Sequence, residues 1–216
     1  MRAKTSLFAL LVLLPCLAAA QDRWESDIRT FEEADTASPP PSGGVVFTGS
    51  SSIVRWRLAE SFPELGARAI NRGFGGSVTA DAVRYVDRIV VPYKPRTVVL
   101  YSGDNDLTTA STPEQIAEQF RLFVSTVRAA LPRARIVIIS IKPSLQRWAL
   151  VDKARAANAI IARDAKAARD VAFLNVEPLM LGADGKPRPE LYVEDGLHMS
   201  PEGYRTWTAA LRPLLR

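Results

Sequence analysis

Thiol and imidazole side chains are almost absent from this sequence, whose 216 residues include one cysteine, Cys16, and one histidine, His198. Protein metal sites are usually built from several histidine, cysteine and carboxylate ligands, so this scarcity argues against a resident metal ion. One cysteine cannot form a disulfide within the chain. The stability of the fold must therefore come from packing of a hydrophobic core.

Long apolar runs and clusters of like charge are also missing. The apolar run at residues 7–14 is too short to span a bilayer. Lysine and arginine outnumber aspartate and glutamate by 28 to 23, but the excess is spread along the chain. Nucleic-acid binding requires a concentrated basic face. We therefore expect no nucleic-acid partner and, after removal of the leader described next, no stable membrane insertion.

The first 20 residues have the three parts of a secretory signal peptide. Arg2 and Lys4 form a basic start, residues 7–14 form the apolar part, and residues 18–20 are three alanines suited to cleavage. The mature chain is then expected to begin at Gln21 and to be secreted or periplasmic. Two alternatives are lipid attachment to the lone cysteine and retention of the leader as an uncleaved anchor.

The rest of the chain is expected to form one domain preceded by a short N-terminal segment. We divide the chain into the signal peptide (1–20), an N-terminal helix with a proline-rich lead-in (21–42), and a single folded domain (43–216). Little sequence precedes the proline run, so residues 21–42 are too few to form a domain of their own.

Short apolar runs alternate with helical periodicities along the folded domain. The expected strands are 45–49, 67–71, 97–101, 135–141 and 171–175. The expected helices are 22–36, 51–62, 80–91, a helix that begins at 112 and includes 127, 148–169 and 200–211. Strands that are nearly all apolar and alternate with helices predict an α/β fold, with a parallel sheet covered on both faces. Ligands of such folds bind beyond the carboxyl ends of the strands, so the turns after the first three strands should converge.

The turn after the first strand carries three serines, Ser50, Ser51 and Ser52. A helix N-terminus has free N–H groups and a partial positive charge, which suit a nucleophilic serine. Serine is also a preferred N-cap, and capping alone would explain one of the three. The choice between a nucleophilic serine and a helix cap depends on residues near the C-terminus.

A base and its orienting carboxylate occur together there, because Asp195 lies three residues before His198. Histidine is the side chain whose ordinary pKa suits a base near neutral pH, and a carboxylate holds its tautomer. The turns after the second and third strands offer Gly76 and Asn105 as oxyanion donors. Each is a common turn residue when taken alone. Their occurrence together with the serine turn favours a nucleophilic serine over three unrelated turns.

Polar and aromatic residues also follow the fourth strand, at the same edge of the expected sheet. Ser144 and Trp148 are candidates for a substrate pocket. Packing explains Trp148 equally well.

Four blocks of this sequence resemble the SGNH (GDSL-type) hydrolase superfamily, named for its Ser, Gly, Asn and His. The resemblance covers residues 43–212 and is carried by Phe47-Thr48-Gly49-Ser50-Ser51, Gly75-Gly76, Gly103-Asp104-Asn105-Asp106 and Asp195-Gly196-Leu197-His198. The usual Gly-Asp-Ser of the first block reads Gly-Ser-Ser here. By register Ser51 is the nucleophile, with Ser50 and Ser52 as alternatives.

This resemblance implies a fold, an activity and a set of roles. The fold is a flavodoxin-like, three-layer α/β/α domain with strand order 2-1-3-4-5, and the activity is hydrolysis of esters or thioesters without a cofactor. Ser51 attacks, His198 is the base, Asp195 orients it, and Ser51, Gly76 and Asn105 hold the oxyanion. Short acyl groups on small molecules, glycans or lipids are the expected substrates. Acyl transfer to a sugar or alcohol and non-catalytic ligand binding are the alternatives, and the sequence does not indicate an oligomeric state.

Overall fold

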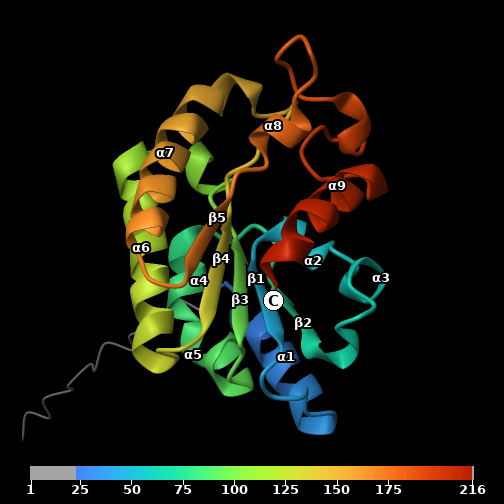
Figure 1. Ribbon diagram of the computed structural model, residues 1–216, viewed down its shortest axis with the longest axis vertical. Helices are drawn as coiled ribbons and strands as arrows, with labels where there is room; N and C mark the ends of the chain where they lie inside the picture. The colour runs from blue at the N-terminus through green and yellow to red at the C-terminus, as the bar shows by residue number, and fades with distance from the viewer. Residues whose placement is uncertain (1–22, 216) are drawn as a thin grey trace, which may run out of the picture.

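The computed structural model describes residues 23–215 as a three-layer α/β/α arrangement (Figure 1). Five parallel strands are hydrogen-bonded in the order β2-β1-β3-β4-β5, which confirms the expected fold. Their bounds are β1 Val45–Gly49, β2 Ala69–Gly73, β3 Thr97–Tyr101, β4 Arg135–Ile139 and β5 Val171–Leu174. The expected signal peptide lies outside the described residues.

Helices cover both faces of the sheet (Figure 1). On one side lie α1 (Glu25–Ala37), α4 (Thr79–Arg84), α5 (Val86–Ile89), α6 (Pro113–Ala130) and α7 (Val151–Ala167); on the other lie α2 (Ser51–Val54), α3 (Leu58–Ser61), α8 (Glu177–Met180) and α9 (Pro201–Leu211). Helix α6 begins where its sequence predicts. Thr112 and Gln115 exchange side-chain to backbone hydrogen bonds there and satisfy two free N–H groups of the first turn.

The sheet separates two hydrophobic clusters, and successive residues of each central strand contribute to opposite ones. In β1, Val46 faces the cluster under α4 to α7, whereas Val45 and Phe47 face the cluster under α2, α3 and α9. This alternation is the period of two that places neighbouring strand side chains on opposite faces. Burial on both faces explains why the central strands β1, β3 and β4 are apolar almost throughout.

The expected helix at 51–62 is instead two short helices, α2 and α3, because Trp56 leaves the helical path between them. Its indole is 2% exposed and packs 5.7 Å from the rings of Phe47, Phe62 and Trp207. The indole N–H donates to Ser61 Oγ at 3.0 Å. Tertiary burial of one large side chain here outweighs local helix propensity, which is weak over so few residues. The expected helix at 80–91 is likewise divided into α4 and α5.

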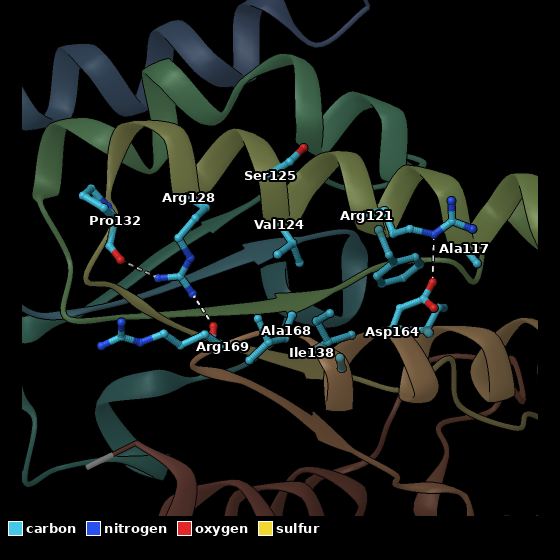
Figure 2. A pocket seen from close by; sticks show the side chains of 14 residues that line it. Ala117, Arg121, Val124, Ser125, Arg128, Pro132, Ile138, Asp164, Ala168 and Arg169 are labelled. Carbon is cyan, nitrogen blue, oxygen red and sulfur yellow. Dashed lines mark hydrogen bonds and ion pairs between the residues drawn. The ribbon is translucent and has the colours of Figure 1, made fainter.

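A cavity of about 320 Å³ lies between α6 and α7, with apolar side chains of both helices in its wall (Figure 2). At one end of it, an ion pair joins Arg121 to Asp164, with 2.8 Å between Nε and Oδ2. Near Pro132, the guanidinium of Arg128 donates to backbone carbonyl groups. None of the predicted catalytic residues lines this cavity.

The last residue of β1 must be glycine for a steric reason. Gly49 has a φ of +129°, and a Cβ added there would lie 1.8 Å from the carbonyl oxygen of Tyr101 on the adjacent strand. That same oxygen accepts a hydrogen bond from the N–H of Ser50 at 3.1 Å. The glycine thus lets the chain leave the sheet tightly and enter the serine turn.

We expect Gly49→Ala to lower the free energy of unfolding by at least about 3 kcal/mol, since it combines a strained φ with overpacking against backbone. Gly43→Ala is the matched control, because Gly43 has a φ of +77° but no atom within 4 Å of an added Cβ. The control should cost only about 1 kcal/mol of conformational strain. Urea unfolding of both variants measures the difference, and equal losses would contradict the steric explanation.

Candidate active site

The carboxyl ends of β1, β2 and β3 lie at one level of the sheet. Gly49 is paired with Gly73 of β2 and with Tyr101 of β3, so the turns that follow all begin at this edge. The serine turn, the glycine turn and the asparagine turn are therefore neighbours, as expected for a parallel α/β sheet.

Ser51, His198 and Asp195 form a continuous chain of hydrogen bonds across this edge. His198 Nε2 lies 2.9 Å from Ser51 Oγ, and His198 Nδ1 lies 2.6 Å from Asp195 Oδ2. An imidazole with a carboxylate on Nδ1 keeps Nε2 free to accept a proton. The arrangement can thus deprotonate the Ser51 hydroxyl and stabilise the imidazolium that forms.

Backbone groups hold the Asp195 carboxylate in place. Its Oδ1 accepts hydrogen bonds from the N–H groups of Leu197 and His198, both at 2.8 Å. Desolvation raises the pKa of Asp195, but the hydrogen bonds from the His198 side chain and from both backbone N–H groups lower it further, so the net shift is downward. The pKa of Asp195 is held well below its usual range, and this carboxylate is ionised throughout the neutral range.

The loop of the histidine is fixed at both ends. The N–H of Val193 donates to the His198 carbonyl at 2.9 Å, and Gly196, with a φ of +65°, accepts from the N–H of Gln146 at 3.1 Å. Two residues after the histidine, Ser200 caps α9 by accepting the Gly203 N–H at 3.2 Å. The helix start and the tight turn together direct the imidazole at the serine turn.

Of the three serines, Ser51 is the one whose hydroxyl contacts the imidazole. The side chains of Ser50 and Ser52 point into the protein, and these residues are 1% and 2% exposed. Tyr204 on α9 donates its hydroxyl to the Ser52 carbonyl at 2.9 Å and so anchors the short α2. Ser51 is the first residue of α2, where a backbone N–H has no acceptor within the helix.

The turns after β2 and β3 lie beside Ser51. A Cβ added at Gly75 would lie 3.9 Å from the Ser51 Cβ, and Gly76 follows with a φ of +77°. Asn105 Nδ2 donates to the carbonyl of Ser77 at 2.9 Å. Because Gly76 lies between Gly75 and Ser77 in the chain, its N–H belongs to the same small region as Ser51 and the Asn105 amide.

Ser144 and Trp148, predicted to line a substrate pocket, have other contacts. Ser144 is 2% exposed, and its Oγ accepts the N–H of Arg147 at 3.2 Å. The Trp148 ring is half-buried and has the Nζ of Lys186 at 4.8 Å from its centroid and the Cζ of Arg155 at 5.7 Å. A role of either residue in substrate binding stays a prediction.

A buried charged cluster beside the site was missed by the sequence reasoning. Lys142, whose side chain is fully buried, donates to the Tyr101 hydroxyl at 3.2 Å and forms an ion pair with Asp104. The Tyr101 hydroxyl also donates to Asp104, and burial together with this carboxylate raises the pKa of Tyr101 well above its usual value. The signal in the sequence was a lysine directly after an apolar strand.

The described part of the chain has neither a cluster of metal ligands nor a membrane-spanning helix. Within residues 23–215, no group of three or more His, Cys, Asp or Glu side chains is arranged to hold a metal ion. No helix in the same range is both long and apolar enough to cross a membrane.

The sequence matches a protein family and is similar to mammalian proteins of one name. Residues 41–206 match the GDSL-like Lipase/Acylhydrolase family. The chain is 31% identical over 199 residues to the Homo sapiens platelet-activating factor acetylhydrolase IB subunit alpha1, covering 89% of this chain and 83% of that protein. The Rattus norvegicus protein of the same name is 29% identical over 198 residues, covering 89% of this chain and 82% of that protein.

Solved structures of similar fold include two bacterial proteins. A GDSL-like lipase from Bacteroides thetaiotaomicron superposes with a TM-score of 0.75 at 21% identity, over 88% of this chain and 97% of that chain. A catalytic mutant of an acetylxylan esterase from Geobacillus stearothermophilus superposes with a TM-score of 0.64 at 16% identity, over 81% of this chain and 95% of that chain. At these identities the likeness is one of fold.

Proposed function

The chain belongs to the GDSL-like lipase/acylhydrolase family and is an ester hydrolase, and on this premise we propose that it acts through a serine acyl-enzyme intermediate, with Ser51 as the nucleophile. The observation that carries the proposal is the hydrogen-bonded chain Ser51–His198–Asp195, with distances of 2.9 and 2.6 Å. A nucleophile, a base and an orienting carboxylate are the three parts that acyl transfer to serine needs.

In the proposed mechanism, Ser51 Oγ attacks the ester carbonyl carbon while His198 Nε2 takes the hydroxyl proton. The tetrahedral intermediate collapses, the carbon–oxygen bond to the alcohol breaks, and the imidazolium returns the proton to the leaving alcohol. A water molecule, deprotonated by the same imidazole, then attacks the acyl-enzyme. The bond between the acyl carbon and Ser51 Oγ breaks, the carboxylic acid leaves, and the imidazolium returns its proton to Oγ. Asp195 remains ionised and stabilises the imidazolium in both halves of the reaction.

Three donors are proposed to hold the oxyanion: the N–H groups of Ser51 and Gly76 and the side-chain amide of Asn105. The support is local geometry. Ser51 N–H is at a helix start, Gly76 follows a residue in contact with Ser51, and Asn105 is tied to the next residue along that turn. Donors fixed before the reaction stabilise charge that develops in the transition state, which makes them effective.

Short acyl groups are the proposed substrate class. The human relative is named as an acetylhydrolase of platelet-activating factor, and this relative matches 89% of the chain. We propose small-molecule, glycan or lipid acyl esters as the substrates. We also propose that the protein is exported, because its first 20 residues have the three parts of a signal peptide.

An ester series with one leaving group and acyl chains of increasing length tests this function. We expect kcat/KM to be highest for the shortest chains and to fall by about tenfold or more as methylenes are added, because a pocket that fits a small acyl group rejects larger ones. Ser51→Ala serves as the blank for background hydrolysis. A value of kcat/KM that rises with chain length would contradict the short-chain assignment while leaving the ester hydrolase assignment intact.

The same assay separates hydrolysis from acyl transfer. Adding a sugar or alcohol acceptor should leave free acid as the main product. If the acylated acceptor becomes the main product, the protein is an acyltransferase with the same nucleophile.

A further inference from the structure

The geometry points to a role for Arg147, which was notable in the sequence only as part of the stretch after β4. We propose that Arg147 is a positioning residue that orients the Asn105 amide and polarises it toward the oxyanion. The inference rests on the proposed function, in which Asn105 is an oxyanion donor.

Two contacts determine which way the Asn105 amide faces. Nη2 of Arg147 donates to Asn105 Oδ1 at 3.1 Å, and Asn105 Nδ2 donates to the Ser77 carbonyl at 2.9 Å. A guanidinium can only donate and a carbonyl oxygen can only accept, so the two partners together exclude the flipped amide. One hydrogen on Nδ2 remains for a third acceptor, and this is the hydrogen that an oxyanion would receive.

Arg147 also forms an ion pair with Asp104. Nη1 of Arg147 and Oδ1 of Asp104 are 3.8 Å apart, and each is buried with no hydrogen-bond partner in the described part of the chain. The side chains are 16% and 6% exposed, so solvent screens this ion pair only weakly. The attraction keeps the guanidinium against the asparagine.

The same carboxylate is fixed by a second cation. Oδ2 of Asp104 accepts hydrogen bonds from Lys142 Nζ and from the Tyr101 hydroxyl. Both donor side chains are buried at the carboxyl edge of the sheet, where Tyr101 ends β3 and Lys142 follows β4. The cluster therefore holds two cations and one carboxylate, and one of the cations, Arg147, contacts Asn105. The positively charged guanidinium that donates to Asn105 Oδ1 draws electron density toward this oxygen and makes Nδ2 a stronger hydrogen-bond donor.

This arrangement explains why charged residues occur in the turns after β3 and β4, although none of them takes part in the proposed proton transfers. Asp104 and Asn105 are adjacent on the turn after β3, while Lys142 and Arg147 both follow β4, the next strand of the sheet. The two turns meet at the carboxyl edge. The turn after β3 contributes the amide and the carboxylate, and the turn after β4 contributes the two cations that pair with them.

A double-mutant cycle tests the inference on the full chain with one short-chain ester. Asn105→Ala should lower kcat by about 10² to 10³, the effect of losing one oxyanion donor, with little change in KM. Arg147→Met should lower kcat by about 10 to 100-fold, less than loss of the donor itself, with KM within about twofold. In the Asn105→Ala background, Arg147→Met should lower kcat by less than about twofold, because its effect passes through the missing amide.

Two further variants act as controls. Arg163→Met removes an arginine that is 71% exposed on α7 and should leave kcat and KM unchanged, which separates a local effect from a loss of overall charge. Arg147→Lys keeps the charge opposite Asp104 but lacks the planar fork, so its kcat should lie between those of wild type and Arg147→Met. If Arg147→Met does not fold, the Lys variant replaces it in the cycle.

The outcomes separate this inference from the proposed function. Effects on kcat that multiply in the double variant would overturn the positioning role, because Arg147 would then act independently of Asn105. A rise in KM at constant kcat would overturn it as well and make Arg147 a substrate-binding residue. An unchanged kcat in Arg147→Met, with the expected loss in Asn105→Ala, would overturn the inference alone. An unchanged kcat in Asn105→Ala would overturn the oxyanion role of Asn105 and this inference with it, while leaving Ser51 as the proposed nucleophile.

Discussion

Ser51→Ala is expected to lower kcat by a factor on the order of 10⁶, the loss typical of removing the nucleophile of a serine hydrolase. The physical reason is that no neighbouring oxygen can take its place at His198 Nε2. The fold should survive, because the substitution removes only Oγ, whose one hydrogen bond in the described residues is to the imidazole. Steady-state rates and thermal unfolding of the same preparations measure both effects.

The neighbouring serines are matched controls for this prediction. Ser50 and Ser52 are 1% and 2% exposed and flank the nucleophile in the same turn. Ser50→Ala and Ser52→Ala should each retain kcat within about tenfold, since neither side chain touches the imidazole. A serine-reactive phosphonate followed by peptide mass mapping should place a single adduct on Ser51. An adduct on either neighbour, or substantial activity in Ser51→Ala, would show that the proposed nucleophile is wrong.

Asp195→Asn is expected to lower kcat/KM by about 10⁴ at neutral pH. The carboxylate accepts from Nδ1 at 2.6 Å, and its replacement by an amide removes the charge that stabilises the imidazolium formed during attack. The amide can also donate to Nδ1 and so favour the tautomer in which Nε2 carries the proton. That tautomer cannot accept the proton of Ser51.

The pH profile of kcat/KM gives an independent measurement of the same interaction. The base must be neutral, so activity should be low in acid and rise through one inflection to a plateau in mild alkali. The pKa of Asp195 is far below this window, so the carboxylate contributes no second inflection. His198 is the only histidine of the chain, which makes the assignment of the inflection direct.

His198→Ala should abolish the inflection together with nearly all activity. A wild-type profile that is flat from mild acid to mild alkali, or activity retained without the imidazole, would contradict a histidine base.

Much of this protein could be predicted from the sequence because the signals are local. Strands buried on both faces must be apolar almost throughout, so the runs that become β1, β3 and β4 were recognisable without tertiary information. The cap of α6 is equally local, since both partners lie within four residues of each other. The pairing of Asp195 with His198 is also local, because three residues separate them in one loop.

Other features were decided only by tertiary structure, because they join distant parts of the chain. Ser51 and His198 are 147 residues apart, and which of three adjacent serines meets the imidazole depends on the path set by Gly49 and Trp56. A shift of one residue in that turn would turn a different hydroxyl toward the base.

The contact between Arg147 and Asn105 spans 42 residues and requires the turns after β3 and β4 to meet at one edge. From the sequence alone, Lys142 and Arg147 are two ordinary cations after a strand. The sequence by itself determined which chemical groups this protein has at the ends of its strands. Burial decided which of them pair, because a charged side chain removed from water must find a partner, and only the assembled sheet shows where that partner lies.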